Sequence, residues 1–144
     1  MISNLQDYFR PEQEIFLDKV NYKRIENTNN KVRKEFALLC QDNVKVSLND
    51  DGVRIIVTRS LVFEPEEIFS MSVSFGTDLR FNERKSEYDW KTINLAEEFR
   101  ENGDFVTAQL MSRVSLIIGQ ITSSFGQQPL ILQPVLVKTN QSEA

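Results

Sequence analysis

Histidine is absent from the 144-residue sequence, and cysteine occurs only once, at Cys40. Without an imidazole, the sequence cannot supply a Ser-His or Cys-His nucleophile, a histidine general base or a histidine-bound zinc site. A single cysteine excludes an internal disulfide and a CxxC motif. Because Cys40 alternates with apolar neighbours, we interpret it as a small buried hydrophobe rather than a reactive thiol.

Glycine is also scarce, with five residues in the chain, and neither a P-loop nor a GxGxxG motif is present. Serines alternate through residues 70–74 of a strand-like segment, without a candidate base near them in the sequence. The carboxylates of Glu64, Glu66 and Glu67 fall in an expected turn without a second acidic cluster, which favours solvation over metal binding. The sequence therefore predicts a protein that is not an enzyme and has no catalytic residue, cofactor or metal site.

The chain lacks both a basic patch and a long apolar run. Its formal net charge is −4, and the basic residues near positions 19–24 and 31–34 are diluted by asparagine and acidic neighbours. A nucleic-acid-binding surface needs a concentrated positive stripe. No apolar run approaches the roughly 18 residues of a membrane helix, and residues 1–7 lack the basic and apolar regions of a signal peptide. We therefore expect a cytoplasmic protein that neither binds nucleic acid nor inserts into a membrane.

Alternating apolar residues, by contrast, are abundant. They predict four strands, over about residues 15–25, 36–48, 53–63 and 69–81. In the first strand we expect the even-numbered residues from Phe16 to Tyr22 to share one face. Between the second and third strands, Asn49-Asp50-Asp51-Gly52 predicts a tight hairpin turn.

Three residues interrupt the apolar rows of these strands. Asp42 lies in the row of the second strand, where we expect a bulge or a turn that divides the strand. Arg59 interrupts the row of the third strand. Gly76 lies in the middle of the fourth strand and predicts a bulge or a sharp bend.

Helical periodicity replaces the strand pattern after residue 82. Asn94, with Glu97 three residues later, predicts the start of a short helix over 95–100, and Asp104 predicts the cap of a longer helix over 105–124. Strands followed by helices indicate an α+β fold, a four-stranded antiparallel sheet with helices packed on one face. We expect an N-terminal polar segment over 1–14, a single domain over 15–137 and a disordered tail over 138–144.

The longer helix carries small residues opposite its apolar stripe. They are Ser112, Ser115, Gly119 and Ser123. Between Asp104 and Glu143 the only charged residues are Arg113 and Lys138, and a solvent-exposed helix normally carries more charge than this. We therefore interpret the small-residue face as an interface in a homodimer or homotetramer, in preference to a solvated face.

Aromatic residues are numerous, with ten phenylalanines, three tyrosines and one tryptophan. A four-stranded sheet covered by one helical layer does not easily bury all of them, so we expect some to line an exposed groove that binds a partner. The candidates lie in polar surroundings in the sequence. They are Tyr8, Phe9, Tyr88 and Trp90.

A segment near the end of the chain resembles a known family. Residues 122–135 read TSSFGQQPLILQPV, which is similar to the end of the main helix and the following Pro-Leu-x-Leu-x-Pro-Val segment of SecB-like protein-export chaperones. The order and spacing of the strands, the hairpin and the helix also match over residues 15–136. The resemblance is closer to remote, shorter members than to the typical export chaperone.

The resemblance implies a SecB-like α+β fold, assembly as a dimer or tetramer, and ATP-independent holding of unfolded polypeptide, with Leu130 and Leu132 in the client-binding surface. It also implies SecA or an antitoxin as a further partner. Two differences from the family are expected, a missing second C-terminal helix and a nearly neutral polar sheet face where the family presents an acidic one to SecA. An adaptor that binds one specific partner, such as an antitoxin or a mobile-element protein, remains the alternative.

Overall fold

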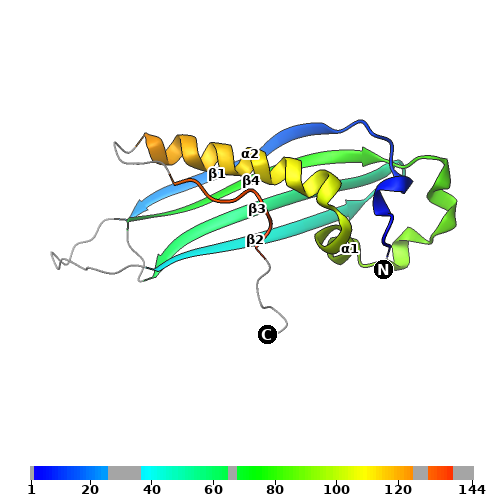
Figure 1. The fold of residues 1–144 in the computed structure, drawn as a ribbon, viewed down its shortest axis with the longest axis horizontal. Helices are drawn as coiled ribbons and strands as arrows, with labels where there is room; N and C mark the ends of the chain where they lie inside the picture. The colour runs from blue at the N-terminus through cyan, green and yellow to red at the C-terminus, as the bar shows by residue number, and fades with distance from the viewer. Residues whose placement is uncertain (1, 26–36, 65–67, 125–129, 138–144) are drawn as a thin grey trace.

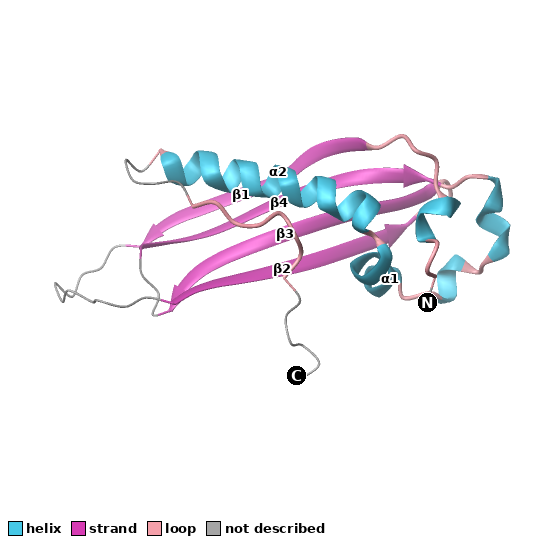
Figure 2. Cartoon of the chain, in the orientation of Figure 1, coloured by secondary structure: helices cyan, strands magenta, loops and turns pink. Residues whose placement is uncertain are grey.

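Four long strands form one antiparallel sheet, and two α-helices lie on one of its faces (Figures 1 and 2). The computed structural model describes residues 2–25, 37–64, 68–124 and 130–137. The elements are η1 (Leu5–Tyr8), β1 (Glu14–Ile25), β2 (Ala37–Leu48), β3 (Gly52–Glu64), β4 (Ile68–Arg80), η2 (Glu83–Glu87), η3 (Trp90–Thr92), α1 (Leu95–Asn102) and α2 (Asp104–Ser123). The predicted α+β class and sheet architecture are confirmed, while the predicted tail at 138–144 lies outside the described residues.

The strands lie in the order β1-β4-β3-β2, so β1 and β2 are the two edges of the sheet. The β2–β3 hairpin turns where the sequence predicts it. The side chain of Asn49 accepts hydrogen bonds from the backbone N–H of Asp51 and Gly52, at 3.0 and 2.7 Å. An asparagine that bonds to its own turn in this way fixes the turn, and with it the register of the two strands.

The helix-bearing face of the sheet contains the core. Odd-numbered residues of β3 and β4, from Val53 to Leu79, are buried there, and α2 packs against β4 and β3 while α1 packs against β2. Asn94 caps α1 as predicted, because its side chain accepts a hydrogen bond from the N–H of Glu97 at 3.3 Å. The second helix begins one residue earlier than predicted, since Gly103 is the N-cap and Asp104 the first helical residue.

The face predicted for β1 is wrong for its first residues, because a bulge changes the parity of the strand. The register shifts between Leu17 and Lys19. Leu17 therefore pairs with the inward-facing Phe75, whereas Phe16 pairs with Gly76 on the outer face. After the bulge, Val20 and later even-numbered residues face the helix side. A bulge adds one residue to one strand and cannot be recognised from alternation within that strand alone.

β4 has no bulge at Gly76, so this part of the expectation is wrong. Gly76 pairs in continuous register with Phe16 on one side and Ile56 on the other. A Cβ at position 76 would lie 2.7 Å from the Phe16 ring and 3.0 Å from the carbonyl oxygen of Ile55. Because Gly76 has no side chain, the ring of Phe16 from the neighbouring strand lies directly against its backbone. The ring fills the space that a side chain at position 76 would otherwise occupy.

Gly76→Ala is expected to lower the free energy of unfolding by about 1–3 kcal/mol, because the added methyl group overlaps the Phe16 ring. Urea titration measures the loss. In a Phe16→Ala background the same substitution should cost much less, since the ring is gone and alanine is otherwise the better strand residue. An equal cost in both backgrounds would show that the ring is not the obstacle.

Candidate functional site

The four small residues of α2 and the last described segment of the chain form a single groove. We call residues 130–137 the C-terminal strap; Figure 1 shows it running back from α2 across the sheet. The groove has a volume of about 520 Å³. Its lining consists of Ser112, Ser115, Leu116, Gly119, Gln120, Ser123, Ile131, Leu132 and Pro134. The structure thus brings together the predicted oligomer interface and one predicted client-binding residue, which are separate in the sequence.

The serines of this α2 groove leave it largely apolar, because their hydroxyls already donate to backbone carbonyls. Ser112 bonds to Ala108 at 3.0 Å and Ser123 to Gln120 at 2.8 Å, both within the helix. Ser115 instead donates to the carbonyl of Leu132 at 2.6 Å and so joins α2 to the strap. No charged residue lines the groove within the described chain. Such a surface suits apolar contact with a polypeptide rather than recognition of a charged ligand.

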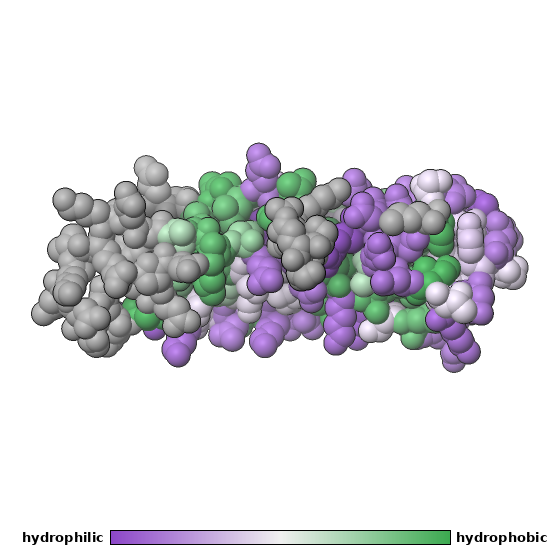
Figure 3. Space-filling view, turned by 90° about the horizontal axis from the view of Figure 1, so that it is seen from below, coloured by the Kyte–Doolittle hydropathy of each residue, from purple (hydrophilic) through white to green (hydrophobic). Residues whose placement is uncertain are grey.

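Large apolar side chains are exposed on the helix-bearing side of the sheet. Leu116 of α2 is 61% exposed and Ile131 of the strap 76%. On the edge strand β1, Leu17 is 53% and Val20 42% exposed, and both face the helix side by their register with β4. Figure 3 shows hydrophobic residues near the end of α2, and a further group of them toward the other end of the molecule. Apolar residues concentrated in this way mark a surface for polypeptide binding or self-association.

The two interruptions predicted in β2 and β3 are partners in one buried ion pair. Asp42 and Arg59 are directly opposite each other in the β2–β3 register. The guanidinium Nε and Nη2 atoms donate to the two carboxylate oxygens at 2.8 Å each, and both side chains are 1% exposed. The expected bulge or turn at Asp42 is therefore wrong, because β2 continues unbroken through it. Hydrogen bonding to Asp42 raises the pKa of Arg59, which keeps the guanidinium charged.

This ion pair also holds the strap. Arg59 donates from Nη1 to the carbonyl of Gln133 at 2.9 Å and from Nη2 to the carbonyl of Val135 at 2.7 Å. Asp42 accepts a hydrogen bond from the backbone N–H of Val137 at 2.7 Å. The charges are thus satisfied by strap backbone as well as by each other, as a buried pair requires. In the sequence, Asp42 and Arg59 each appear only as a charged residue that interrupts a row of apolar residues.

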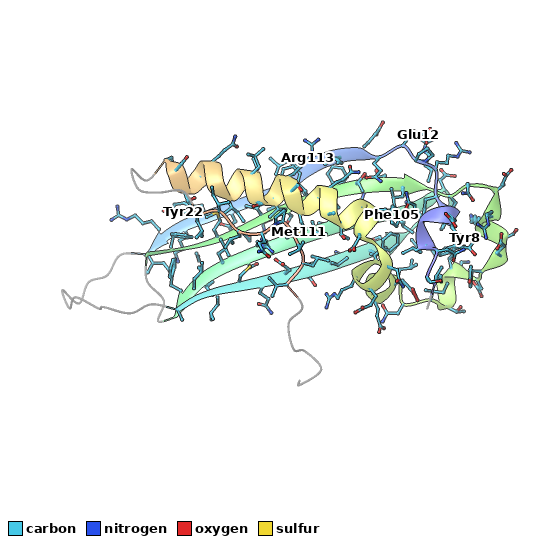
Figure 4. The ribbon with its side chains drawn as sticks, in the orientation of Figure 1. Tyr8, Glu12, Tyr22, Phe105, Met111 and Arg113 are labelled. Carbon is cyan, nitrogen blue, oxygen red and sulfur yellow. The ribbon has the colours of Figure 1, made fainter. Side chains whose placement is uncertain are left out.

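The exposure expected for Tyr8, Phe9 and Trp90 is wrong, because these three residues are only 2–6% exposed. Phe9 stacks on Phe81 with ring centroids 5.1 Å apart, and Trp90 lies 4.9 Å from Phe81. Residues 2–9 fold back over the end of the sheet, where Figure 4 shows Tyr8. Together with residues of η3 they extend the hydrophobic core there. Of the four candidates, only Tyr88 is exposed, at 41%.

The other predicted site residues lie apart from these. Leu130 and Leu132 are half-buried against the core, on the inner side of the strap. Cys40 is partly buried on β2, where desolvation raises the pKa of its thiol, so it is a weak nucleophile. Within the described ranges, no group of three or more acidic or cysteine side chains could hold a metal ion. No helix of that part of the chain is both long and apolar enough to cross a membrane.

The outer face of the sheet differs in character from the helix-bearing face. Hydroxyl side chains of Thr58 and Ser74 are 2.7 Å apart across β3 and β4. Arg54 forms a bidentate pair with Asp78, at 2.7 and 2.9 Å, and this lowers the pKa of Asp78. Lysines at positions 19, 23 and 45 occupy outward positions of the edge strands. This face is mostly polar and is not acidic, although Leu39 and Val62, paired across β2 and β3, are 44% and 39% exposed on it.

Comparison with known proteins identifies the fold. No protein-family model and no curated protein matches the sequence. Among solved structures, the chain is similar to the Mycobacterium tuberculosis Rv1957 SecB-like chaperone in complex with a ChAD peptide from the Rv1956 HigA1 antitoxin, with a TM-score of 0.67 and 12% identity, covering 91% of this chain and 90% of that one. A Streptococcus agalactiae protein of unknown function also matches, with a TM-score of 0.40 and 15% identity, covering 84% and 94%. The four-stranded sheet with its helices on one face is a SecB-like fold, as the resemblance implied.

Proposed function

We propose that this protein is an ATP-independent chaperone that holds non-native polypeptide on the helix-bearing side of its sheet. The observation that carries the proposal is the apolar surface along the helix-bearing side of β1 on a SecB-like fold, where Leu17 is 53%, Val20 42% and Tyr22 38% exposed. Burial of apolar side chains is non-directional, so such a surface accepts many sequences. The likeness to a chaperone that is in complex with an antitoxin peptide supports a polypeptide as the ligand. No catalytic step is part of the proposal.

Suppression of aggregation tests this proposal. Two unrelated proteins, unfolded in denaturant and diluted without nucleotide, should scatter much less light when this chain is present at a near-stoichiometric ratio. Val20→Glu, on the helix side of β1, should weaken the suppression by at least severalfold, because it places a charge in the apolar surface. Val20 is 42% exposed, so the fold should tolerate the change.

Leu39→Glu is the matched control for this experiment. Leu39 is 44% exposed on the other edge strand, β2, and faces the outer side of the sheet. This variant should suppress aggregation as well as the unmodified chain does. If the unmodified chain suppresses neither client and captures one specific protein instead, it is an adaptor and the proposal is wrong. Equal weakening by both variants would place the client elsewhere.

We also propose that the α2 groove is a contact between copies of this chain, in a homodimer or homotetramer. The small residues permit close approach of a second helix, and the groove carries no charge. Delivery of clients to SecA is not part of the proposal, because the outer face carries lysines and the Arg54–Asp78 pair rather than an acidic surface. We expect the protein to act in the cytoplasm.

Gly119→Arg should reduce the mass of the assembly in solution, as measured by light scattering after size-exclusion chromatography. Among the described residues, the carbonyl oxygen of Leu130, at 3.9 Å, is the one heavy atom that a Cβ at position 119 would meet within 4 Å, so we expect the fold to accommodate the side chain, which then fills the groove. Arginine is also the better helix residue. Gln109→Arg, at an exposed position of α2 outside the groove, should leave the mass unchanged. A monomeric unmodified chain would contradict the proposed interface.

A further inference from the structure

The hydrogen bonds between the strap and the body of the protein all use the main chain of the strap, among the described residues. In the described residues, five hydrogen bonds join them, and each links a strap backbone atom to a body side chain. The backbone partners are Leu130 N–H, Leu132 C=O, Gln133 C=O, Val135 C=O and Val137 N–H. Thr122, Ser115, Arg59 and Asp42 provide the side chains. Any extended polypeptide offers the same carbonyl and amide groups, whatever its sequence.

The side chains of the strap alternate only in part, because Pro134 is exposed and the chain bends at residues 134 and 135. Leu130, Leu132 and Leu136 pack against the core, whereas Ile131 and Val135 are 76% and 56% exposed. The body therefore contacts the apolar side chains at positions 130, 132 and 136, on both sides of this bend. It also offers donors to three backbone carbonyls and acceptors for two backbone amides of the strap. This is the general form of sequence-tolerant peptide recognition, in which backbone bonds give affinity and alternate pockets give limited preference.

The Asp42–Arg59 pair makes this a built site rather than an incidental contact. Both side chains are 1% exposed, and their mutual bonds use Nε and Nη2. Arg59 directs Nη1 to the carbonyl of Gln133 and shares Nη2 with that of Val135, while Asp42 receives the amide of Val137. A buried ion pair needs such additional partners, so whichever chain leaves the site must be replaced by another or by water. The pair therefore favours an occupied site.

We propose that the seat of the strap is an extended-peptide site, occupied by the strap in the free protein and taken over by an apolar segment of a non-native polypeptide. This inference rests on the proposed holding function and assigns a site to it. Replacement of the strap by a client segment leaves the number of hydrogen bonds to the body unchanged, because the segment forms the same backbone bonds that the strap loses. The strap then acts as an internal competitor that covers the site until a client displaces it.

A peptide of residues 130–137, with fluorescein at its N-terminus and an amidated C-terminus, is the probe. It is titrated against the full-length, isotopically labelled protein, with binding measured by fluorescence anisotropy and exchange of the strap amides by NMR. We expect binding to accelerate hydrogen exchange at the amides of Leu130 and Val137 of the protein, since both donate to the body in the free state. Amides of β3 and β4 should not change. Binding without acceleration at the strap, or no binding at millimolar peptide, would overturn the proposal.

Two altered peptides and one protein variant test the mode of recognition. N-methylation at the residue equivalent to Val137 removes the bond to Asp42 and should weaken binding about tenfold. Replacement of the three leucines by asparagine should abolish it. In the Asp42→Leu/Arg59→Met protein, the N-methylated and unmethylated peptides should bind equally. Equal binding of these two peptides to the unmodified protein would refute recognition of the peptide backbone. The holding function itself is tested separately, by the aggregation assay with Val20→Glu.

Discussion

Arg59→Met is expected to lower the free energy of unfolding by about 3–5 kcal/mol, because it breaks a buried ion pair and leaves one charge without its partner. The change leaves the carboxylate of Asp42 buried, with the N–H of Val137 as its remaining partner among the described residues. It also removes the two donors to the carbonyls of Gln133 and Val135. Urea titration at pH 7 measures the loss, provided that the unfolding transition remains two-state.

The double variant Asp42→Leu/Arg59→Met is the control for this prediction. Because it leaves no unpaired charge in the core, its stability should fall far less than that of Arg59→Met alone. The strap amide of Val137 should nevertheless exchange faster, since its acceptor is gone. A loss below about 1 kcal/mol for Arg59→Met would mean that solvent reaches Asp42 when the guanidinium is removed, and would contradict the burial of the pair.

Trp90→Ala is expected to lower the free energy of unfolding by about 3–5 kcal/mol, as for other large aromatic residues in protein cores. Trp90 is 4% exposed, lies within 6 Å of the rings of Phe9, Phe81, Tyr8 and Tyr88, and donates from Nε1 to the carbonyl of Lys85 at 2.7 Å. Thermal or urea unfolding followed by circular dichroism measures the loss, since the substitution removes the only tryptophan.

Tyr88→Ala gives the comparison for Trp90. Tyr88 contacts the same cluster but is 41% exposed, so its removal should cost about 1 kcal/mol or less. Phe9→Ala should resemble Trp90→Ala and should also shift the emission of Trp90 to longer wavelength, because it opens the tryptophan to water. A small loss for Trp90→Ala with weakened client binding would restore the view that this residue belongs to a binding surface.

The buried rings around Trp90 explain why the number of aromatic residues led to the wrong expectation that Tyr8, Phe9 and Trp90 are exposed. The inference that one helical layer cannot cover all the rings treats residues 1–14 as separate from the domain. In the structure, the amide of Asn82 donates to the carbonyl of Tyr8 at 3.0 Å, and Phe9 bridges to Phe81. These contacts join segments more than 70 residues apart, and neither segment carries a local signal of its partner.

Local patterns were sufficient for most of the secondary structure. Alternation predicts β2, β3 and β4, and the Asn49–Gly52 turn and the Asn94 cap depend on side chains that bond to backbone two or three residues away. The small-residue face of α2 is equally visible, because helical periodicity repeats within the element. Predictions succeed here because the interactions concerned lie within one turn, one hairpin or one helix.

The amino-acid sequence by itself determined the order of the elements, the hairpin, the apolar and small-residue faces, and the resemblance that pointed to the SecB-like fold. Only the tertiary structure decided which face of β1 is inward and that the ring of Phe16 packs against Gly76. It also decided that Asp42 and Arg59 form an ion pair whose side chains bind the strap. The physical reason is that strand register and chain return set these contacts. A residue's own neighbours in the sequence report its periodicity, but they do not report which distant side chain satisfies its charge or fills the space beside it.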